Sequence, residues 1–182
     1  MWVYIIVPIV ALIIVYSLIA YNSFVKLNNK VEEAFSTMDI YLKKRWDLIP
    51  NLVEVVKGYA KHEEDVFTEI AESRNSIYDD LSSTEKIKTN ERLSRSIGRV
   101  IAIAEAYPDL KVSENFKALS KELTKVEDEI ANSRKYYNGT VRIYNNKIKT
   151  FPSMLFAKLF GCQPRVMFKA NAEERKHVEV KL

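Results

Sequence analysis

Residues 45–63 read RWDLIPNLVEVVKGYAKHE, and this stretch combines a helical apolar repeat with polar residues that the repeat does not require. Its apolar positions, at steps of four, three and four residues, are Leu48, Leu52, Val55 and Tyr59. Such spacing keeps side chains on one seam of a packed helix. A polar line beside this seam contains Asp47, Asn51 and Glu54. The stretch therefore predicts a bundle helix whose polar stripe is either a set of structural hydrogen bonds or a functional surface.

The apolar repeat extends from Leu27 to Val66, which predicts one long, coiled-coil-like helix that ends near Gly58. Pro50 lies inside this helix. Proline removes a backbone donor and clashes with the preceding turn, yet the apolar phase is the same on both sides of Pro50. We therefore expect a kink near residues 46–50 rather than a break.

The N-terminal segment has no charged side chain before Lys26, and residues 2–21 are almost entirely apolar or aromatic, enough for a helix to cross a bilayer. A cleaved signal peptide is the alternative, but a basic start and an Ala-x-Ala site are missing and the apolar run is too long. Residues 1–22 are therefore predicted to anchor the chain in the lipid bilayer. Lys and Arg follow the span and none precede it, so we expect the N-terminus outside the inner cell membrane and the domain in the cytoplasm.

The charges and the cysteine count restrict the class of protein further. The 182 residues include 28 Lys and Arg against 24 Asp and Glu, interspersed beyond the span, so no nucleic-acid partner is expected. Cys162 is the single cysteine, which agrees with a reducing compartment.

Three further helices are expected, over residues 63–81, 84–106 and 113–150. Thr84 and Ser113 would cap the last two, and residues 107–111 form the turn between them. Four helices with short connections pack most simply as an up-down-up-down antiparallel bundle. The prediction is an all-α fold with this bundle over residues 23–161, followed by a charged, partly extended tail over residues 162–182.

Residues 151–160 read FPSMLFAKLF, a short amphipathic helix in which only Lys158 is charged. With an even number of helices the fourth returns toward the membrane and brings this segment close to the lipid surface. The segment either caps the bundle or lies among the lipid headgroups. One basic residue gives little attraction to lipid, so the cap is slightly favoured.

Equal rise along antiparallel helices allows the polar residues to be paired by counting. Three pairings follow: Asp47 with Arg74, Arg45 with Glu127 or Glu129, and Arg142 with Glu33. Buried pairs of Arg and a carboxylate fix register more than they raise stability, so a structural interpretation is favoured for these residues. For Asn51, Lys57 and His62, near the distal turn, the functional interpretation stays open.

The second and third helices are too short to flank the whole of the first and fourth, which leaves a two-helix stalk next to the membrane. Its apolar side chains are expected to be partly exposed: Ala34, Phe35, Met38, Tyr41, Tyr136, Tyr137 and Val141. Contiguous apolar patches mark binding or self-association surfaces. The stalk is therefore predicted to bind a membrane protein or a second copy of the chain, chiefly through Phe35, Met38, Tyr41, Tyr137 and Val141.

Three groups of residues carry a family resemblance. They are Arg45, Asp47 to Val53, Val56, Lys57, Tyr59, His62, Glu63 and Arg74; Tyr107 to Lys111; and Arg134, Tyr136, Tyr137, Asn138, Arg142, Tyr144, Asn145, Phe151, Pro152, Phe160 and Gly161. With them the chain resembles the LemA family of bacterial membrane-anchored helical proteins over nearly its whole length, although Gly139 and Cys162 depart from the pattern. The resemblance implies an external N-terminus, one membrane span and a cytoplasmic helical bundle, and it implies no activity.

An enzyme needs a constellation of catalytic side chains, and the sequence offers few candidates. Neither His62 nor His177 belongs to an HExxH pair, and the one Glu-x-x-His motif, which ends at His177, lies in the tail. The sequence also lacks a glycine-rich phosphate loop and a GxSxG elbow. We therefore expect no enzymatic activity, no catalytic or metal-binding residues and no cofactor.

The leading interpretation is a membrane-anchored interaction or scaffold module. One alternative is a lipid-surface protein that uses residues 151–160, and another is an enzyme with a polar site near Pro50. The candidate interaction or structural residues are Arg45, Asp47, Asn51, Lys57, Tyr59, His62, Glu63, Arg74, Arg134, Asn138, Arg142 and Asn145.

Overall fold

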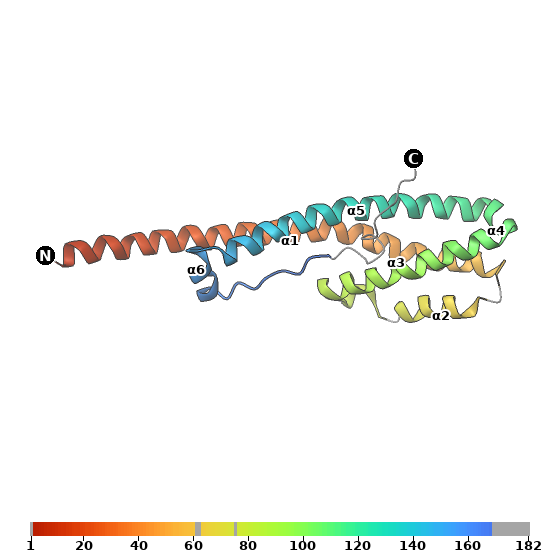
Figure 1. Ribbon diagram of the computed structural model, residues 1–182, viewed down its shortest axis with the longest axis horizontal. Helices are drawn as coiled ribbons and strands as arrows, with labels where there is room; N and C mark the ends of the chain where they lie inside the picture. Colours follow the sequence, from red (N-terminus) through yellow and green to blue (C-terminus); the bar gives the residue numbers. More distant parts are fainter. Residues whose placement is uncertain (1, 61–62, 75, 169–182) are drawn as a thin grey trace, which may run out of the picture. The chain divides into compact units, whose positions relative to one another are not determined.

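The computed structural model describes residues 2–60, 63–74 and 76–168, and every regular element in these ranges is a helix (Figure 1). The α-helices are α1 (Val3–Lys57), α2 (Glu64–Ser73), α3 (Ser83–Ala106), α4 (Pro108–Val112), α5 (Glu114–Lys149) and α6 (Ser153–Leu159). A short 3-10 helix, η1 (Tyr78–Asp80), separates α2 from α3. The predicted all-α class is confirmed, whereas the up-down-up-down arrangement stays a prediction.

Helix α1 runs without a break from the apolar N-terminal segment through Pro50, as the constant apolar phase predicted. The side chains on both sides of the proline that face the protein are buried: Trp46, Ile49, Leu52 and Val56. Residues 3–15 are exposed and apolar, and α1 is the one described helix long and apolar enough to cross a membrane. Packing of the seam therefore holds the helix together where proline removes one backbone hydrogen bond.

Helix α2 is shorter than predicted because the chain leaves the helix after Ser73. Ile77, which the predicted helix placed in the core, is 69% exposed, and Tyr78 is buried instead. Burying Tyr78 on η1 requires a turn before it, and Ser and Asn between residues 73 and 76 have low helix propensity. The prediction of one helix over residues 63–81 is therefore wrong.

The ends of the next helices also differ from the prediction. Ser82, not Thr84, is the N-cap of α3: its hydroxyl accepts from the Glu85 backbone N–H, and the Glu85 carboxylate accepts from the Ser82 N–H in a capping box. Residues 107–111, predicted as a turn, contain most of α4, which begins with Pro108 at its first position. Helix α5 continues through Gly139 and ends at Lys149, as predicted.

The described residues form two compact units. One contains residues 37–133 and Phe168, and the other contains residues 2–36 and 134–167. The core of the first unit is built from apolar residues of α1, α2, α3, α4 and the N-terminal half of α5, among them Met38, Ile49, Val56, Ile70, Leu93, Val100, Leu110 and Leu123. The predicted domain boundaries at residues 22 and 161 stay predictions.

The second unit contains α6, the adjoining parts of α1 and α5, and an extended segment, residues 162–167 (Figure 1). Gly161, with φ +67°, ends α6, and the Cys162 N–H donates to the Ala157 carbonyl, the bond that defines a Schellman motif. The extended segment then returns along the helices, because the Tyr137 hydroxyl donates to the Val166 carbonyl at 2.8 Å. Residues 169–182, the rest of the predicted tail, lie outside the described residues.

The predicted exposure of the stalk is therefore mostly wrong. Ala34, Met38, Tyr137 and Val141 are buried, Phe35 and Tyr41 are half-buried, and Tyr136 is exposed. Sequence counting treated residues 162–167 as a free tail, whereas in the structure they pack on the same unit as Tyr137 and Val141. The expectation of a partner at this surface stays a prediction.

Candidate functional site

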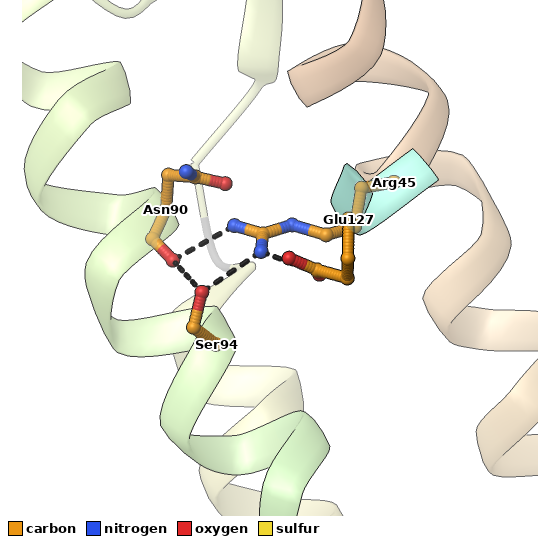
Figure 2. Close-up of polar contacts among 4 residues, drawn as sticks. All are labelled: Arg45, Asn90, Ser94 and Glu127. Carbon is orange, nitrogen blue, oxygen red and sulfur yellow. Dashed lines mark hydrogen bonds and ion pairs between the residues drawn. The ribbon is translucent and has the colours of Figure 1, made fainter. Parts of the chain in front are cut away.

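The Arg45 cluster, which consists of Arg45, Asn90, Ser94 and Glu127, lies in the core of the unit that contains residues 37–133 (Figure 2). The Arg45 guanidinium donates to Glu127 Oε1 at 2.7 Å, to Ser94 Oγ at 2.8 Å and to the Asn90 carbonyl at 2.9 Å. Ser94 Oγ also donates to the Asn90 carbonyl. One side chain of α1 is thereby bonded to both α3 and α5.

The burial of the two charged groups differs sharply. The Arg45 side chain is 1% exposed, whereas Glu127 is 38% exposed and reaches water. The N–H groups of a buried guanidinium need hydrogen-bond acceptors. Because these acceptors belong to α3 and α5, the requirement fixes which residues of the two helices face α1. The predicted pairing of Arg45 with Glu127 is confirmed, and its geometry supports a structural interpretation.

A second polar group, the Asp39 cluster, contains Asp39, Tyr78 and Lys86. The Tyr78 hydroxyl donates to one Asp39 carboxylate oxygen at 2.6 Å, and Lys86 donates to the other at 2.7 Å. Lys86 Nζ also lies 4.5 Å from the centre of the Tyr78 ring, and Trp46 packs on the same ring at 5.3 Å between ring centres. Burial, together with the hydrogen bond to Asp39, raises the pKa of Tyr78. Sequence reasoning missed this cluster because it placed Tyr78 inside a longer helix.

Arg74 and Asp47 were expected to form an ion pair. The two residues are neighbours, but each contacts a different side chain, so the expected ion pair is wrong. The Arg74 guanidinium lies over the Trp46 ring at 5.0 Å, and Asp47 accepts from Lys43 at 2.9 Å. Burial lowers the pKa of Arg74, and the charge of Asp47 opposes this shift. Arg74 therefore stacks on Trp46 instead of forming a salt bridge with Asp47.

The described distal polar candidates on and just after α1 lie along three separate grooves. Asn51 and Tyr59 line a groove of about 680 Å³ with Ser113 and Asn115, between α1 and the start of α5. Lys57 lines two other grooves, of about 560 and 290 Å³, with residues of α2, and its ammonium lies 5.3 Å from the Phe67 ring centre.

The two remaining distal candidates sit before α2. Glu63 is half-buried immediately in front of the helix and makes no side-chain capping bond to it. His62 lies outside the described residues. The described candidates therefore do not converge on one site, as an enzyme centred near Pro50 would require.

The candidates on α5 lie in the unit that contains residues 2–36 and 134–167. Asn145 clasps the extended segment, since its amide donates to the Arg165 carbonyl at 2.8 Å and accepts from the Arg165 N–H at 2.9 Å. The Arg165 guanidinium then donates to Asn28 and Glu32 of α1 at 2.7 and 2.9 Å. Contacts to a backbone carbonyl carry no sequence signal, so this clasp was not predicted.

The other α5 candidates have different environments. Arg134 and Asn138 are half-buried, while Arg142 lies exposed rather than buried against Glu33. Burial raises the pKa of Tyr137, whose hydroxyl holds the extended segment, and a nearby Arg165 opposes the shift. Tyr137 thereby connects α5 to the extended segment.

The described residues offer little support for a catalytic or metal-binding site. In residues 2–60, 63–74 and 76–168, no three His, Cys, Asp or Glu side chains gather so that they could hold a metal ion. Cys162 is half-buried beside the Tyr144 hydroxyl. The pKa of Tyr144 is raised, mainly by burial and secondly by the neighbouring Cys162. A tyrosine with a raised pKa stays protonated at neutral pH, so the Tyr144 hydroxyl is not available there as a base for this thiol.

Comparisons with known proteins identify a family and several relatives of the chain. The model of the LemA family matches residues 34–182. Protein LemA of Metamycoplasma hominis is 25% identical over 159 residues, which cover 87% of this chain and 73% of that protein. Magnetosome protein MamQ of Magnetospirillum gryphiswaldense and magnetosome protein MamQ 1 of Paramagnetospirillum magneticum are each 22% identical over 170 residues, which cover 79% of this chain and 62% of the relative. The match therefore spans less than two thirds of the length of the magnetosome proteins.

Proposed function

We propose a function for this chain from one established premise, that it belongs to the LemA family. The chain is a single-pass protein of the inner cell membrane, with its N-terminus outside and its helical part in the cytoplasm. There it serves as an interaction or scaffold module without enzymatic activity. Its helices α1, α2, α3 and α5 are arranged as an antiparallel up-down-up-down bundle.

The observation that carries this proposal is the continuity of α1. One unbroken helix presents an exposed apolar surface over residues 3–15 and inserts Arg45 into the core of the other unit. A helix of about 20 apolar residues spans a bilayer core of roughly 30 Å. The same backbone therefore supplies both the anchor and a central element of the helical domain.

The distribution of charge supports the cytoplasmic orientation. Residues 1–36 and 134–167, which adjoin the span, contain nine Lys or Arg and two Glu. Over the whole chain the formal net charge is only +4, so the basic excess is concentrated next to the anchor. Positive residues near a span favour the cytoplasmic side, where they also face anionic lipid.

The groove lined by Asn51, Tyr59 and Asn115 is the surface that we assign to a protein partner. It lies on two helices, α1 and α5, and combines exposed amides with an exposed aromatic ring. Aromatic residues surrounded by polar ones are typical of protein interfaces. Its lining residues Asn51, Tyr59 and Asn115 are exposed, which leaves the groove accessible to a partner.

Site-specific photocrosslinking in intact membranes tests the interaction module. A photoreactive amino acid replaces Tyr59 or Asn115, which share the groove, and Lys121, an exposed residue of α5 outside it, serves as the matched control. The proposal predicts the same discrete crosslinked product at both groove positions and its absence at Lys121. Equal crosslinking at all three positions, or different products at Tyr59 and Asn115, would contradict it.

A further inference from the structure

Helix α6 packs directly on the apolar part of α1. The Phe156 ring lies 5.2 Å from the ring centre of Tyr16, and Phe160 lies 5.2 Å from Tyr21. Figure 1 shows α6 beside this part of α1, and both belong to the same compact unit, which contains α1 up to residue 36. Helix α6 is therefore fixed at the level of Tyr16 and Tyr21.

This level lies within the predicted span. If α6 were kept in water, the hydrocarbon core would have to end before Tyr16. Residues 2–15 would then be the only spanning part, and 14 helical residues extend over about 21 Å. A bilayer core is roughly 30 Å thick, so residues up to about Tyr21 are needed to cross it. Tyr16 lies five residues, or about 7.5 Å, inside that end of the span, which is within the depth of about 5–10 Å that interfacial helices reach.

The face of α6 that points away from the protein is apolar. Leu155 and Leu159 are four residues apart on α6 and are 55% and 74% exposed, and Phe151, which precedes the helix, is 74% exposed, whereas Ser153 and Ala157 are buried. A spacing of four residues places side chains on one side of a helix. None of the described residues covers this stripe of Phe151, Leu155 and Leu159.

The charges around the stripe are of one sign. Residues 134–167 contain seven Lys or Arg and not one Asp or Glu, and both Lys149, at the end of α5, and Lys158, on α6, are exposed. Basic side chains next to an apolar surface favour contact with anionic phospholipid, whereas a water-facing or protein-facing surface does not require this bias.

We propose that α6 is a second membrane contact, seated in the headgroup region beside the span, with Phe151, Leu155 and Leu159 covered by phospholipid. This inference rests on the proposed membrane anchor, because it places α6 by its contacts with α1. The span alone leaves α1 free to rotate about its own axis and to tilt relative to the bilayer. The lateral contact through α6 restricts both motions for the membrane-adjacent unit.

Spin-label accessibility tests the proposal on the full chain in vesicles of equimolar phosphatidylglycerol and phosphatidylcholine. In a Cys162→Ala background, single cysteines at exposed sites carry the label: Leu155→Cys on α6, Leu12→Cys in the span, and Ile40→Cys on α1 beyond it. We expect oxygen to relax the Leu155 label more than a water-soluble nickel chelate does, as at Leu12, and the opposite ranking at Ile40. Lys158→Cys should fall between Leu155 and Ile40.

The outcomes separate this proposal from the anchor on which it rests. Lipid-like accessibility at Leu12 with water-like accessibility at Leu155 would overturn the α6 contact alone. Water-like accessibility at both positions would overturn the anchor as well. A Leu155 label shielded from both reagents would mean that a protein surface, such as a second copy of the chain, covers the stripe, and would also overturn the proposal.

Discussion

Removing Glu127 should destabilise the protein more than removing Arg45, although both changes break the same ion pair. Glu127→Ala leaves a guanidinium that is 1% exposed without its carboxylate, whereas Arg45→Met leaves a carboxylate that is 38% exposed and can be hydrated. Methionine also fills much of the space of the arginine stem. The asymmetry therefore follows from the difference in burial of the two charges.

The expected size lies between two limits. Breaking a fully buried ion pair costs about 3–5 kcal/mol, and an exposed pair contributes about 0.2–1 kcal/mol. Because solvent screens Glu127, we expect a loss of about 2 kcal/mol for Glu127→Ala and about 1 kcal/mol or less for Arg45→Met. For a domain of this size, about 2 kcal/mol lowers the Tm by roughly 4–8 °C.

Thermal unfolding of the full chain in detergent micelles, followed by far-ultraviolet circular dichroism, measures these differences. The double variant Arg45→Met with Glu127→Ala should be about as stable as Arg45→Met alone, since Glu127 then has no buried charge to neutralise. Lys117→Ala, which removes the exposed pair with Glu114, is the matched control and should leave the Tm nearly unchanged. An Arg45→Met variant less stable than Glu127→Ala, or losses that add fully in the double variant, would refute the reasoning.

Ser82→Ala should lower the stability by about 1 kcal/mol through loss of the α3 N-cap, measured by thermal unfolding, while Ser83→Ala at the neighbouring helical position should not. The raised pKa of Tyr78 means that the folded state holds this proton more tightly than the unfolded state, so its contribution is complete below about pH 10 and is lost as the pH rises further. Tyr78→Phe should therefore weaken the fall of Tm between neutral pH and about pH 11, and an unchanged slope would count against the burial of this hydroxyl. Leu12→Arg should reduce the fraction that resists carbonate extraction from membranes, because arginine at the centre of a span costs about 2.5–3.5 kcal/mol, whereas Ile40→Arg should not. Equal extraction of both variants would contradict the span.

The long helices and one buried pairing could be predicted from the sequence. Helices α1 and α5 carry apolar repeats over many turns, so single irregular residues such as Pro50 and Gly139 do not change the phase. Counting placed Arg45 beside Glu127 or Glu129, and the structure shows Glu127, because both helices are unbroken and rise equally per residue. Register errors therefore do not accumulate along them.

The short elements could not be predicted in the same way. Ile77 and Tyr78 are adjacent apolar residues, and a short stretch cannot decide which of them faces the core. Choosing Ile77 extended α2 too far and hid the Asp39 cluster. The same error gave Arg74 an ion pair with Asp47 in place of its stacking on Trp46.

The sequence pattern did not predict the packing of residues 162–167. Tyr137 and Asn145 bind the main chain of Val166 and Arg165, and such bonds accept any side chain at the bound position. Gly161 was the one signal, since a glycine after a helix commonly redirects the chain. It indicated where α6 ends but not where the chain goes next.

Labelling of single cysteines in intact cells tests the membrane-anchored orientation most directly. In the Cys162→Ala background, one cysteine is placed in an extension before residue 1 and another replaces Lys121, and both are exposed to a membrane-impermeant maleimide. We predict labelling of the extension in intact cells and labelling at Lys121 only after the membrane is permeabilised. Labelling of Lys121 in intact cells, or labelling of both cysteines from the same side, would contradict a single span with a cytoplasmic helical domain.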